Sequence, residues 1–298
     1  MRVFLTGATG FIGAAVAQEL IRAGHSVLGV ARTEAGATAL RERGIEPHFG
    51  DLMDHDSFID GARLCDAVAH CAFIHDFSKF MENMEIERAT VSAMLDALEG
   101  SGRPFVATSG VAGLAPGRMA SEEDTPARQG RGATEALVRG ASARGLKTAV
   151  IRLPPITHEN GAGGFLPPLA DIARETGKVA YVGDGANRWP TGNRADAAVL
   201  YRLALEGAEP GSAYHAVGEE GVTARAIAEA LAKRLGLPTI SLAPEEAMGH
   251  FGWIGMFAAL DMPASSRITQ ERLGWRPTHR GLLEDIASAP TLGTRLST

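Results

Sequence analysis

The first half of the chain alternates short apolar runs with segments whose apolar residues recur every three or four positions. The runs predict buried strands at residues 2–5, 26–30, 46–49, 67–70, 105–108 and 147–153. The segments between them predict helices at residues 11–23, 33–43, 57–61, 81–98 and 134–144. This alternation is typical of a parallel sheet with helices on both faces. We therefore predict an α/β fold built on a doubly wound parallel sheet.

After Pro154 the alternation loosens. Helices are predicted at residues 166–176, 196–206 and 223–235, the last with Thr223 as N-cap, and short strands at 180–182 and 214–217. Residues 158–164 are rich in glycine and are expected to form a loop. No Pro/Gly/Ser-rich linker divides the chain. We expect a sheet-forming domain over residues 1–155 and a smaller lobe over residues 156–298, with segments near 190–217 returning to the sheet.

A glycine-rich turn links the first predicted strand to the first predicted helix. Gly7, Gly10 and Gly13 have the spacing GxxGxxG. In such a loop the first glycine permits a tight turn, the second lets the backbone approach a pyrophosphate, and the third lets the helix pack on the strand. The free N–H groups at the helix start attract phosphates. The residues expected to line a dinucleotide here are Gly7, Thr9, Gly10, Phe11, Ile12 and Gly13.

The end of the second predicted strand discriminates between two dinucleotides. NAD enzymes usually carry Asp or Glu there to hold the ribose hydroxyls. This chain has Arg32 followed by Thr33, and a guanidinium can pair with a 2′-phosphate. We therefore expect NADP(H) and rank NAD(H) below it, although a solvated surface position also explains Arg32. Asp51 and Leu52 follow the third strand and are expected near the adenine, unless Asp51 only stabilises a turn.

Several motifs together resemble the extended and atypical short-chain dehydrogenase/reductase superfamily. They are TGATGFIG at residues 6–13, GDLMD at 50–54, DAVAHCA at 66–72, ATSG at 107–110 and LGWRP at 273–277. The resemblance covers nearly the whole chain. It implies a Rossmann-type core, a substrate between the carboxyl edge of the sheet and the lobe, and a homodimer formed through helices 81–98 and 134–144. It also implies cofactor contacts from residues at later strand ends, namely Cys71, Ala72, Phe73, Thr108, Arg131, Leu153, Pro154 and Pro155.

The chain departs from this superfamily at the catalytic positions. The family uses a serine or threonine, a tyrosine and a lysine. When Glu135 is aligned with the family's glutamate after its YxxxK motif, Ala127 stands at the tyrosine position and Arg131 at the lysine position. The chain's tyrosines, at positions 181, 201 and 214, all lie in its second half, and Tyr201 and Tyr214 are interpreted as core or surface residues. The chain therefore resembles a subgroup that replaces the YxxxK pair with other, often basic, residues.

Other polar residues near the predicted strand ends are candidates for the missing chemistry. Ser109 could hydrogen-bond a substrate carbonyl group, or cap local backbone. Arg131 could hold ribose hydroxyls or an oxyanion, or face solvent, but a guanidinium does not release a proton at neutral pH. His75, beside Asp76, and His158, after the sixth strand, are candidates for the proton donor because imidazole titrates near neutral pH. Each of them could instead be a bystander in the cleft.

Composition narrows the classes of function. The formal net charge is −6, from 29 basic and 35 acidic residues, so neither nucleic acid nor an anionic membrane is an expected partner. No apolar run approaches the length of a membrane span, and the N-terminus lacks the features of a signal peptide. Two cysteines are too few for a disulfide framework, and the histidines show no metal-binding spacing. We expect a cytoplasmic protein that binds no metal and acts on a small molecule.

The predicted lobe says little about the substrate. Arg188 and Arg194 could grip a diphosphate, as an arginine does in sugar-nucleotide enzymes of the family, or be solvated. The aromatic and Met-rich segment 250–257 is expected to line an apolar pocket or to pack within the lobe. We predict an NADP-dependent oxidoreductase, first of all a reductase, acting on a carbonyl, alcohol or activated double bond of a largely apolar substrate. The alternatives are a redox-silent NADP-binding sensor or scaffold, and an isomerase or lyase of the epimerase/dehydratase type.

Overall fold

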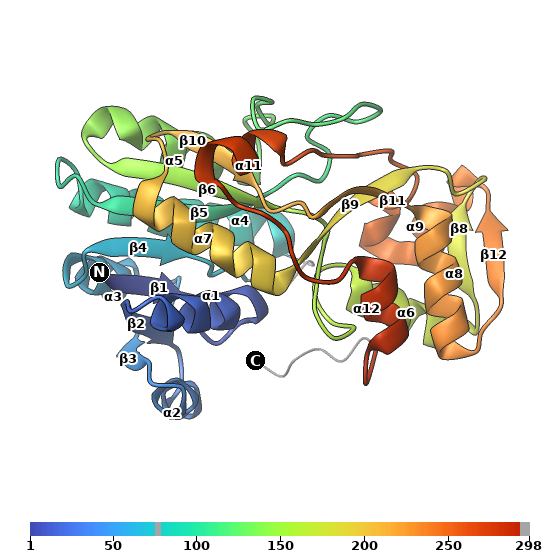
Figure 1. Cartoon of the computed structure of the whole chain (residues 1–298), viewed down its shortest axis with the longest axis horizontal. Coiled ribbons are helices and arrows are strands. Elements are labelled where there is room, and N and C mark those ends of the chain that lie inside the picture. Colours follow the sequence, from blue (N-terminus) through green and yellow to red (C-terminus); the bar gives the residue numbers. More distant parts are fainter. Residues whose placement is uncertain (75–78, 293–298) are drawn as a thin grey trace.

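Seven parallel strands form the central sheet of the computed structural model, which describes residues 1–74 and 79–292 (Figure 1). In sheet order they are β10 (Ser212–His215), β6 (Lys147–Leu153), β5 (Pro104–Gly110), β4 (Ala67–His70), β1 (Arg2–Thr6), β2 (Ser26–Ala31) and β3 (Glu46–Phe49). The chain runs outward from β1 to β3 and then crosses back to β4 on the other side of β1. The carboxyl ends of β1 and β4 therefore flank a topological switch point, where open α/β sheets bind ligands. The predicted doubly wound parallel sheet is confirmed.

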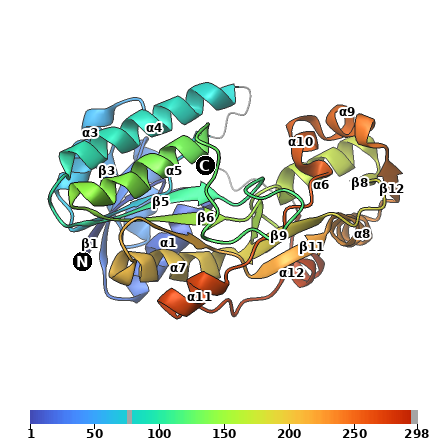
Figure 2. The same cartoon turned by 90° about the horizontal axis from the view of Figure 1, so that it is seen from above.

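Helices cover both faces of this sheet because each buries an apolar stripe against it. Figure 2 shows α1 (Phe11–Arg22) and α7 (Arg194–Gly207) on one face, and α3 (His55–Arg63), α4 (Phe80–Ala97) and α5 (Arg131–Gly140) on the other. Helix α2 (Glu34–Glu42) packs beside β2 and β3. Helix α5 begins three residues before the predicted start, and the 3₁₀ helix η2 (Ala141–Arg144) continues it.

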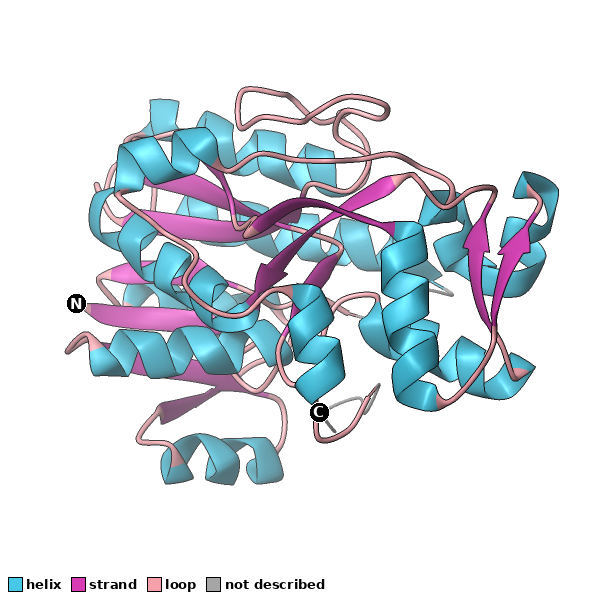
Figure 3. Ribbon diagram, turned by 45° about the vertical axis from the view of Figure 1, so that its right-hand side comes forward, coloured by secondary structure: helices cyan, strands magenta, loops and turns pink. Residues whose placement is uncertain are grey.

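A second, smaller group of elements lies beyond the carboxyl edge of the sheet and has a hydrophobic core of its own (Figure 1). Its helical elements are α6 (Leu166–Thr176), α8 (Ala224–Leu235), η3 (Pro244–Glu246), α9 (Ala247–Phe251), η4 (Gly252–Ile254), α10 (Gly255–Ala258) and α12 (Leu282–Ser288). Its strands form two small sheets, one of β7 (Ile156–His158), β9 (Arg188–Asn193) and β11 (Glu219–Thr223), the other of β8 (Val179–Val182) and β12 (Thr239–Leu242) (Figure 3).

Several strands of this smaller group are not indicated by the sequence pattern. Strand β9 contains Pro190 and Gly192, which are rare in strand interiors, and β11 has no fully buried residue. His158 ends β7, whereas the sequence predicts a loop that starts there. The strand predicted at residues 214–217 is β10, which begins two residues earlier and pairs with β6. Together with α7, which packs on α1, β10 brings this part of the chain back to the central sheet.

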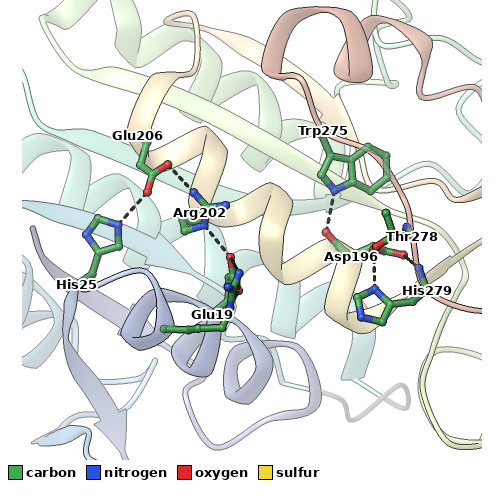
Figure 4. A network of polar contacts seen from close by, with 9 residues as sticks. Glu19, His25, Asp196, Arg202, Glu206, Trp275, Thr278 and His279 are labelled. Carbon is green, nitrogen blue, oxygen red and sulfur yellow. Dashed lines mark hydrogen bonds and ion pairs between the residues drawn. The ribbon is translucent and has the colours of Figure 1, made fainter.

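The start of α7 is held by the LGWRP motif and the residues that follow it (Figure 4). Asp196 accepts hydrogen bonds from the backbone N–H groups of Thr278 and His279 at 3.0 and 3.1 Å. Its carbonyl oxygen accepts another from Trp275 Nε1 at 2.9 Å. The motif follows α11 (Arg267–Leu273), and the Trp275 ring is buried in the core beside α7. The contribution of this motif is therefore structural.

Candidate cofactor and active site

The glycine loop between β1 and α1 is fixed by backbone contacts. A Cβ atom at Gly13 would lie 2.1 Å from the Gly7 carbonyl oxygen. One at Gly7, where φ is +68°, would lie 2.8 Å from the Cys71 carbonyl carbon. Within the described part of the chain, a Cβ atom at Gly10 would meet only the Gly7 oxygen, at 3.3 Å. Because this single contact would be tight without being a collision, the approach of a ligand to its backbone explains the glycine best.

The ends of β1 and β4 are joined through the Thr6 hydroxyl group. Its oxygen accepts hydrogen bonds from the N–H groups of Cys71 and Ala72, both at 3.1 Å. Since both acceptor sites are used, its proton points to His70 Nδ1, at 2.9 Å. The ring proton of His70 is then on Nε2. Burial, together with the charge of Arg131, lowers the pKa of His70 to about 3, so this histidine is neutral and is not a proton donor at neutral pH.

Arg32 follows β2 directly and is exposed. It forms no ion pair with any residue in the described ranges, so its guanidinium is free for a ligand. The next residue, Thr33, caps α2 by accepting the N–H of Gly36 at 3.1 Å. A Cβ atom at Gly36 would lie 3.6 Å from a methyl group of Thr9, so the start of α2 and the glycine loop are neighbours. The structure thus places Arg32 and the glycine loop at the same part of the sheet edge.

The two residues predicted near the adenine both have contacts within the fold. Asp51 Oδ1 accepts the N–H of Met53 at 2.9 Å, which is the geometry of a turn residue. Leu52 is buried, and its carbonyl oxygen accepts a hydrogen bond from Thr90 Oγ1 at 2.8 Å. These contacts favour the turn alternative for Asp51.

Arg131 is the first residue of α5 and reaches α4 and β5. Its Nη2 atom donates to Glu87 Oε1 at 3.1 Å and to the Thr108 carbonyl oxygen at 3.0 Å. Its guanidinium carbon lies 4.5 Å from the centre of the Phe73 ring, a cation–π distance. The side chain is 27% exposed. A fixed and partly open positive charge therefore lies at the carboxyl end of β5.

Glu87 belongs to this site, although it is not among the residues predicted from the sequence. Its side chain is 1% exposed, and burial raises the pKa of its carboxyl group against the opposing effect of Arg131. A signal was present in α4, where Asn83, Glu87 and Thr90 follow helical spacing and are all buried. Three polar residues along the buried stripe of a helix indicate polar partners beneath it.

Strand β5 carries two candidates with different surroundings. Ser109 is 6% exposed, and its hydroxyl group makes no hydrogen bond to the residues that the structure describes. Thr108 Oγ1 donates to the His70 carbonyl oxygen at 2.8 Å and so accepts from the Tyr201 hydroxyl at 2.6 Å. Tyr201 reaches β5 from α7, on the face opposite α5, and is fully buried, as expected of a core residue. Burial also raises the pKa of the nearby Cys71 thiol to about 12, which excludes a reactive thiolate.

Of the two histidines predicted as proton donors, the structure describes only His158. His75 lies outside the described residues. His158 is 1% exposed, and its Nδ1 atom lies 3.3 Å from Asp285 Oδ2. Asp285 also accepts the backbone N–H groups of residues 160 and 161, both at 2.9 Å. His158 and Asp285 thus brace the loop after β7, and both ring nitrogens of His158 are buried.

The two arginines considered for a substrate diphosphate are engaged within the chain. Arg188 forms a two-pronged pair with Asp261, at 2.8 and 3.0 Å. Arg194 pairs with Glu159 and donates to the Phe11 carbonyl oxygen at 3.2 Å. Because each guanidinium already has a carboxylate partner, neither is a free charge for a diphosphate.

The segment 250–257 packs within the smaller group of elements. The half-buried Phe165 ring lies 5.1 Å from the ring of Trp253 and 5.5 Å from that of Phe257, measured between centres. A mostly apolar pocket lies between α6, β8 and α8, and His250 and Phe251 of this segment line it. The three rings therefore give this part of the molecule a partly exposed aromatic surface.

A buried ion pair fixes α5 one turn beyond Arg131. Arg152 of β6 is fully buried, and its Nε atom donates to both carboxylate oxygens of Glu135, at 3.2 and 3.1 Å. Arg152 Nη1 also lies 3.1 Å from His215 Nε2 of β10. Three neighbouring elements are tied together by these contacts, so Glu135 and Arg152 are structural residues.

Comparison with known proteins identifies the family. Residues 3–217 match the model of the NAD dependent epimerase/dehydratase family. The chain belongs to this family. An uncharacterized protein of Schizosaccharomyces pombe is 42% identical to it over 291 residues, which cover 97% of this chain and 99% of the other.

More distant matches are similar to the chain in sequence or in fold. The 2-alkyl-3-oxoalkanoate reductase of Stenotrophomonas maltophilia is 28% identical over 263 residues, covering 82% of this chain and 78% of the reductase. The dTDP-glucose 4,6-dehydratase DesIV of Streptomyces venezuelae, solved with NAD and TYD bound, has a TM-score of 0.77 at 18% identity, over 97% of this chain and 95% of that one. The similarity to DesIV shows a shared fold.

Members of the epimerase/dehydratase family bind a nicotinamide dinucleotide, and the residues of this chain fit one. The glycine loop forms a backbone cradle at the start of α1, and the space at Gly10 is the space that a pyrophosphate needs.

Within residues 1–74 and 79–292, no group of three His, Cys, Asp or Glu side chains gathers to hold a metal ion. In the same ranges no helix has the length and apolar character to cross a membrane.

Proposed function

We propose that this member of the epimerase/dehydratase family is an NADP-dependent oxidoreductase that acts chiefly as a reductase. Its target is a carbonyl, alcohol or activated double bond in a small, largely apolar molecule. One observation carries the proposal: the open guanidinium of Arg131 and the free hydroxyl of Ser109 both lie at the carboxyl end of β5. Polar groups fixed at this position can stabilise charge that develops during a reaction. A protein that only binds a dinucleotide has no need of them.

The preference for NADP(H) is supported by the surroundings of Arg32. Its guanidinium is exposed beside the glycine loop, and no carboxylate follows β2 at the place where one would hold two ribose hydroxyls. Arg32→Asp is therefore expected to weaken NADPH binding while leaving NADH binding nearly unchanged. Fluorescence titration with both cofactors measures this, and an unchanged ratio of the two affinities would refute the preference.

Two features support an apolar substrate: the two arginines considered for a diphosphate are paired within the chain, and aromatic side chains are partly exposed in the smaller group of elements. Arg188 and Arg194 are both neutralised by carboxylates of the chain, and the exposed edges of the aromatic surface around Phe165 offer apolar contact. A reductase of 2-alkyl-3-oxoalkanoates is among the relatives, which supports a keto group as the target. We propose that this chain takes an uncharged carbonyl compound, between the sheet edge and the lobe that starts near residue 156.

The chain's own groups account for binding and orientation. When bound, the reduced nicotinamide supplies hydride. Ser109 Oγ donates a hydrogen bond to the substrate oxygen, and the Arg131 guanidinium stabilises the negative charge on it. Arg131 Nη1 is available for this because the bonds to Glu87 and Thr108 both use Nη2. Arg131 keeps its proton, so another group must supply one, and the burial of His158 favours His75 or water over it.

A direct test follows NADPH absorbance in the presence of ketones, aldehydes and enones. Turnover of any apolar carbonyl compound supports the proposal. Tight NADPH binding without turnover across a broad panel would instead support a redox-silent sensor, which the absence of tyrosine at position 127 favours. Conversion of the substrate without net oxidation of NADPH would support an isomerase or lyase.

The oligomeric state and the cellular location of the protein are also proposals. We propose a cytoplasmic homodimer that forms through α4 and α5. Light scattering during gel filtration tests the dimer, and a monomeric mass at working concentrations would contradict it.

A further inference from the structure

Three neighbouring residues on β4, α4 and α5 each have a buried polar atom without a hydrogen-bond partner among the described residues. These atoms are His70 Nε2, Glu87 Oε2 and Arg131 Nε. They belong to one connected cluster, because Glu87 Oε1 accepts Arg131 Nη2 at 3.1 Å and lies 3.9 Å from His70 Nε2. Buried polar atoms almost always have a partner. Three such atoms in one cluster therefore indicate a small polar molecule that completes it.

A water molecule has the hydrogen-bonding capacity that this cluster requires. Since His70 Nδ1 takes the proton of Thr6, His70 Nε2 is a donor, and Arg131 Nε is a donor as well. Water can accept both of these hydrogen bonds and still offer its own two protons. With Glu87 as a carboxylate, one of these protons goes to Glu87 Oε2. With Glu87 as an acid, its Oε2–H instead donates to the water and takes one of the two acceptor sites. In both states one proton of the water is free to point away from the cluster.

We propose that Glu87 is the proton store of the active site and that it serves the substrate through a water molecule held by His70 Nε2 and Arg131 Nε. The inference rests on the proposed reductase function. It supplies the acid that neither Arg131 nor a tyrosine provides on the α5 side of the sheet. Glu87 acts through the water and is therefore a positioning and proton-holding residue, because its side chain is too buried to touch a substrate.

The proton balance of the step is simple. In the reduction of a carbonyl group, the carbon gains hydride from the reduced nicotinamide, and the oxygen gains one proton. The water gives that proton and receives one from the carboxylic acid of Glu87. Glu87 is left as a carboxylate beside the Arg131 guanidinium, which stabilises it until solvent returns a proton. The net change is one carbonyl group, one NADPH and one proton converted into one alcohol and one NADP⁺.

The electrostatic surroundings agree with this role. The charged or titratable groups that face Glu87, within the described ranges, are His70 from β4 and Arg131 from α5. Burial raises the pKa of Glu87, and Arg131 opposes that effect only in part. The carboxyl group therefore holds its proton at higher pH than an exposed glutamate does. Reduction needs the protonated form, so the rate should fall as pH rises through this pKa.

The first experiment compares kcat and its pH profile in the wild type, Glu87→Gln and Glu122→Gln. Glu122 is a matched control because it is also buried with one unpartnered oxygen, but its other oxygen binds Thr269. We expect Glu87→Gln to lower kcat at least about 100-fold and to lose the decline at high pH. Its Kd for NADPH should stay within about threefold of the wild type. Glu122→Gln should keep both kcat and the pH profile, whereas wild-type turnover in Glu87→Gln would overturn the proposal.

A second readout is independent of turnover. Infrared difference spectra of the cofactor-free protein, taken between low and high pH, should show a protonated carboxyl band that Glu87→Gln removes and Glu122→Gln retains. If Glu87→Gln does not fold, Glu87→Asp should shift the band, because it keeps an acid on a shorter side chain. Absence of any Glu87-dependent band wherever the protein is folded overturns the proposal. If the band is present but no compound is reduced, the proton store stands and the proposed reductase function fails.

Discussion

The glycine loop and the start of α5 lie on the same edge of one sheet, yet they keep the family pattern to different degrees. The loop retains all three glycines, whereas the alignment predicted from the sequence puts Ala127 and Arg131 where the family has tyrosine and lysine. The loop supplies backbone geometry, and a Cβ atom at Gly13 would collide with backbone. The start of α5 supplies charge and a proton, which several side chains on neighbouring elements can provide. Steric requirements admit one residue type, while chemical requirements admit many arrangements.

The largest effect is expected from Gly13→Ala. The added Cβ atom would lie 2.1 Å from the Gly7 carbonyl oxygen and 2.7 Å from the Gly7 carbonyl carbon, so the loop must move. We expect the free energy of unfolding to fall by about 5 kcal/mol and NADPH binding to be lost. Urea denaturation and NADPH fluorescence measure the two effects.

Two matched variants sharpen this test of the loop. Gly10→Ala should fold normally but bind NADPH weakly, because its Cβ atom meets protein only at 3.3 Å. Gly140→Ala, at the end of α5, adds a methyl group with no neighbour within 4 Å and should be neutral or slightly stabilising. Normal NADPH binding in both Gly13→Ala and Gly10→Ala would show that backbone geometry does not govern the loop.

A smaller but still large effect is expected at the base of α5. Glu135→Ala leaves the fully buried Arg152 without its carboxylate, which should lower the free energy of unfolding by about 3 kcal/mol. Chemical denaturation measures it, with Glu229→Ala, which breaks an exposed pair with Arg225 on α8, as the control. A loss no greater than that of the control would mean that α5 is not anchored by this pair.

The next effect concerns the rate of turnover. Arg131→Ala should lower kcat at least about tenfold with little change in the Kd for NADPH, because it removes the charge that faces the substrate oxygen. Arg139→Ala, on the same helix but bonded to the Gly211 carbonyl, is the control. His75→Ala tests the alternative donor predicted from the sequence: a tenfold loss would favour His75, whereas the Glu87 proposal expects the wild-type rate. Wild-type rates in both Arg131→Ala and His75→Ala would refute their catalytic roles.

A region can be predicted from the sequence when its interactions join residues that are close together in the chain. The sheet and its helices are set by local periodicity, and the loop by the spacing of three glycines, so both could be predicted. Glu87 could not be paired with Arg131 because their contact depends on how α4 and α5 rotate about their axes. The burial of His158 depends on Asp285, which lies on a helix more than a hundred residues later. Long-range pairing of charges leaves no periodic signal in one sequence.

The smallest effect is expected from the substitution that restores the family's tyrosine. Ala127 is exposed and lies before α5, because the helix begins only at Arg131, after Gly130 with its φ of +54°. A tyrosine at position 127 is therefore not carried on the helix beside residue 131, and Ala127→Tyr should change kcat by no more than about twofold. The same carbonyl panel measures it, and Arg128→Tyr, at the exposed neighbouring position, is the control. A tenfold gain in Ala127→Tyr alone would show that the family's geometry survives here and that only the side chain was lost.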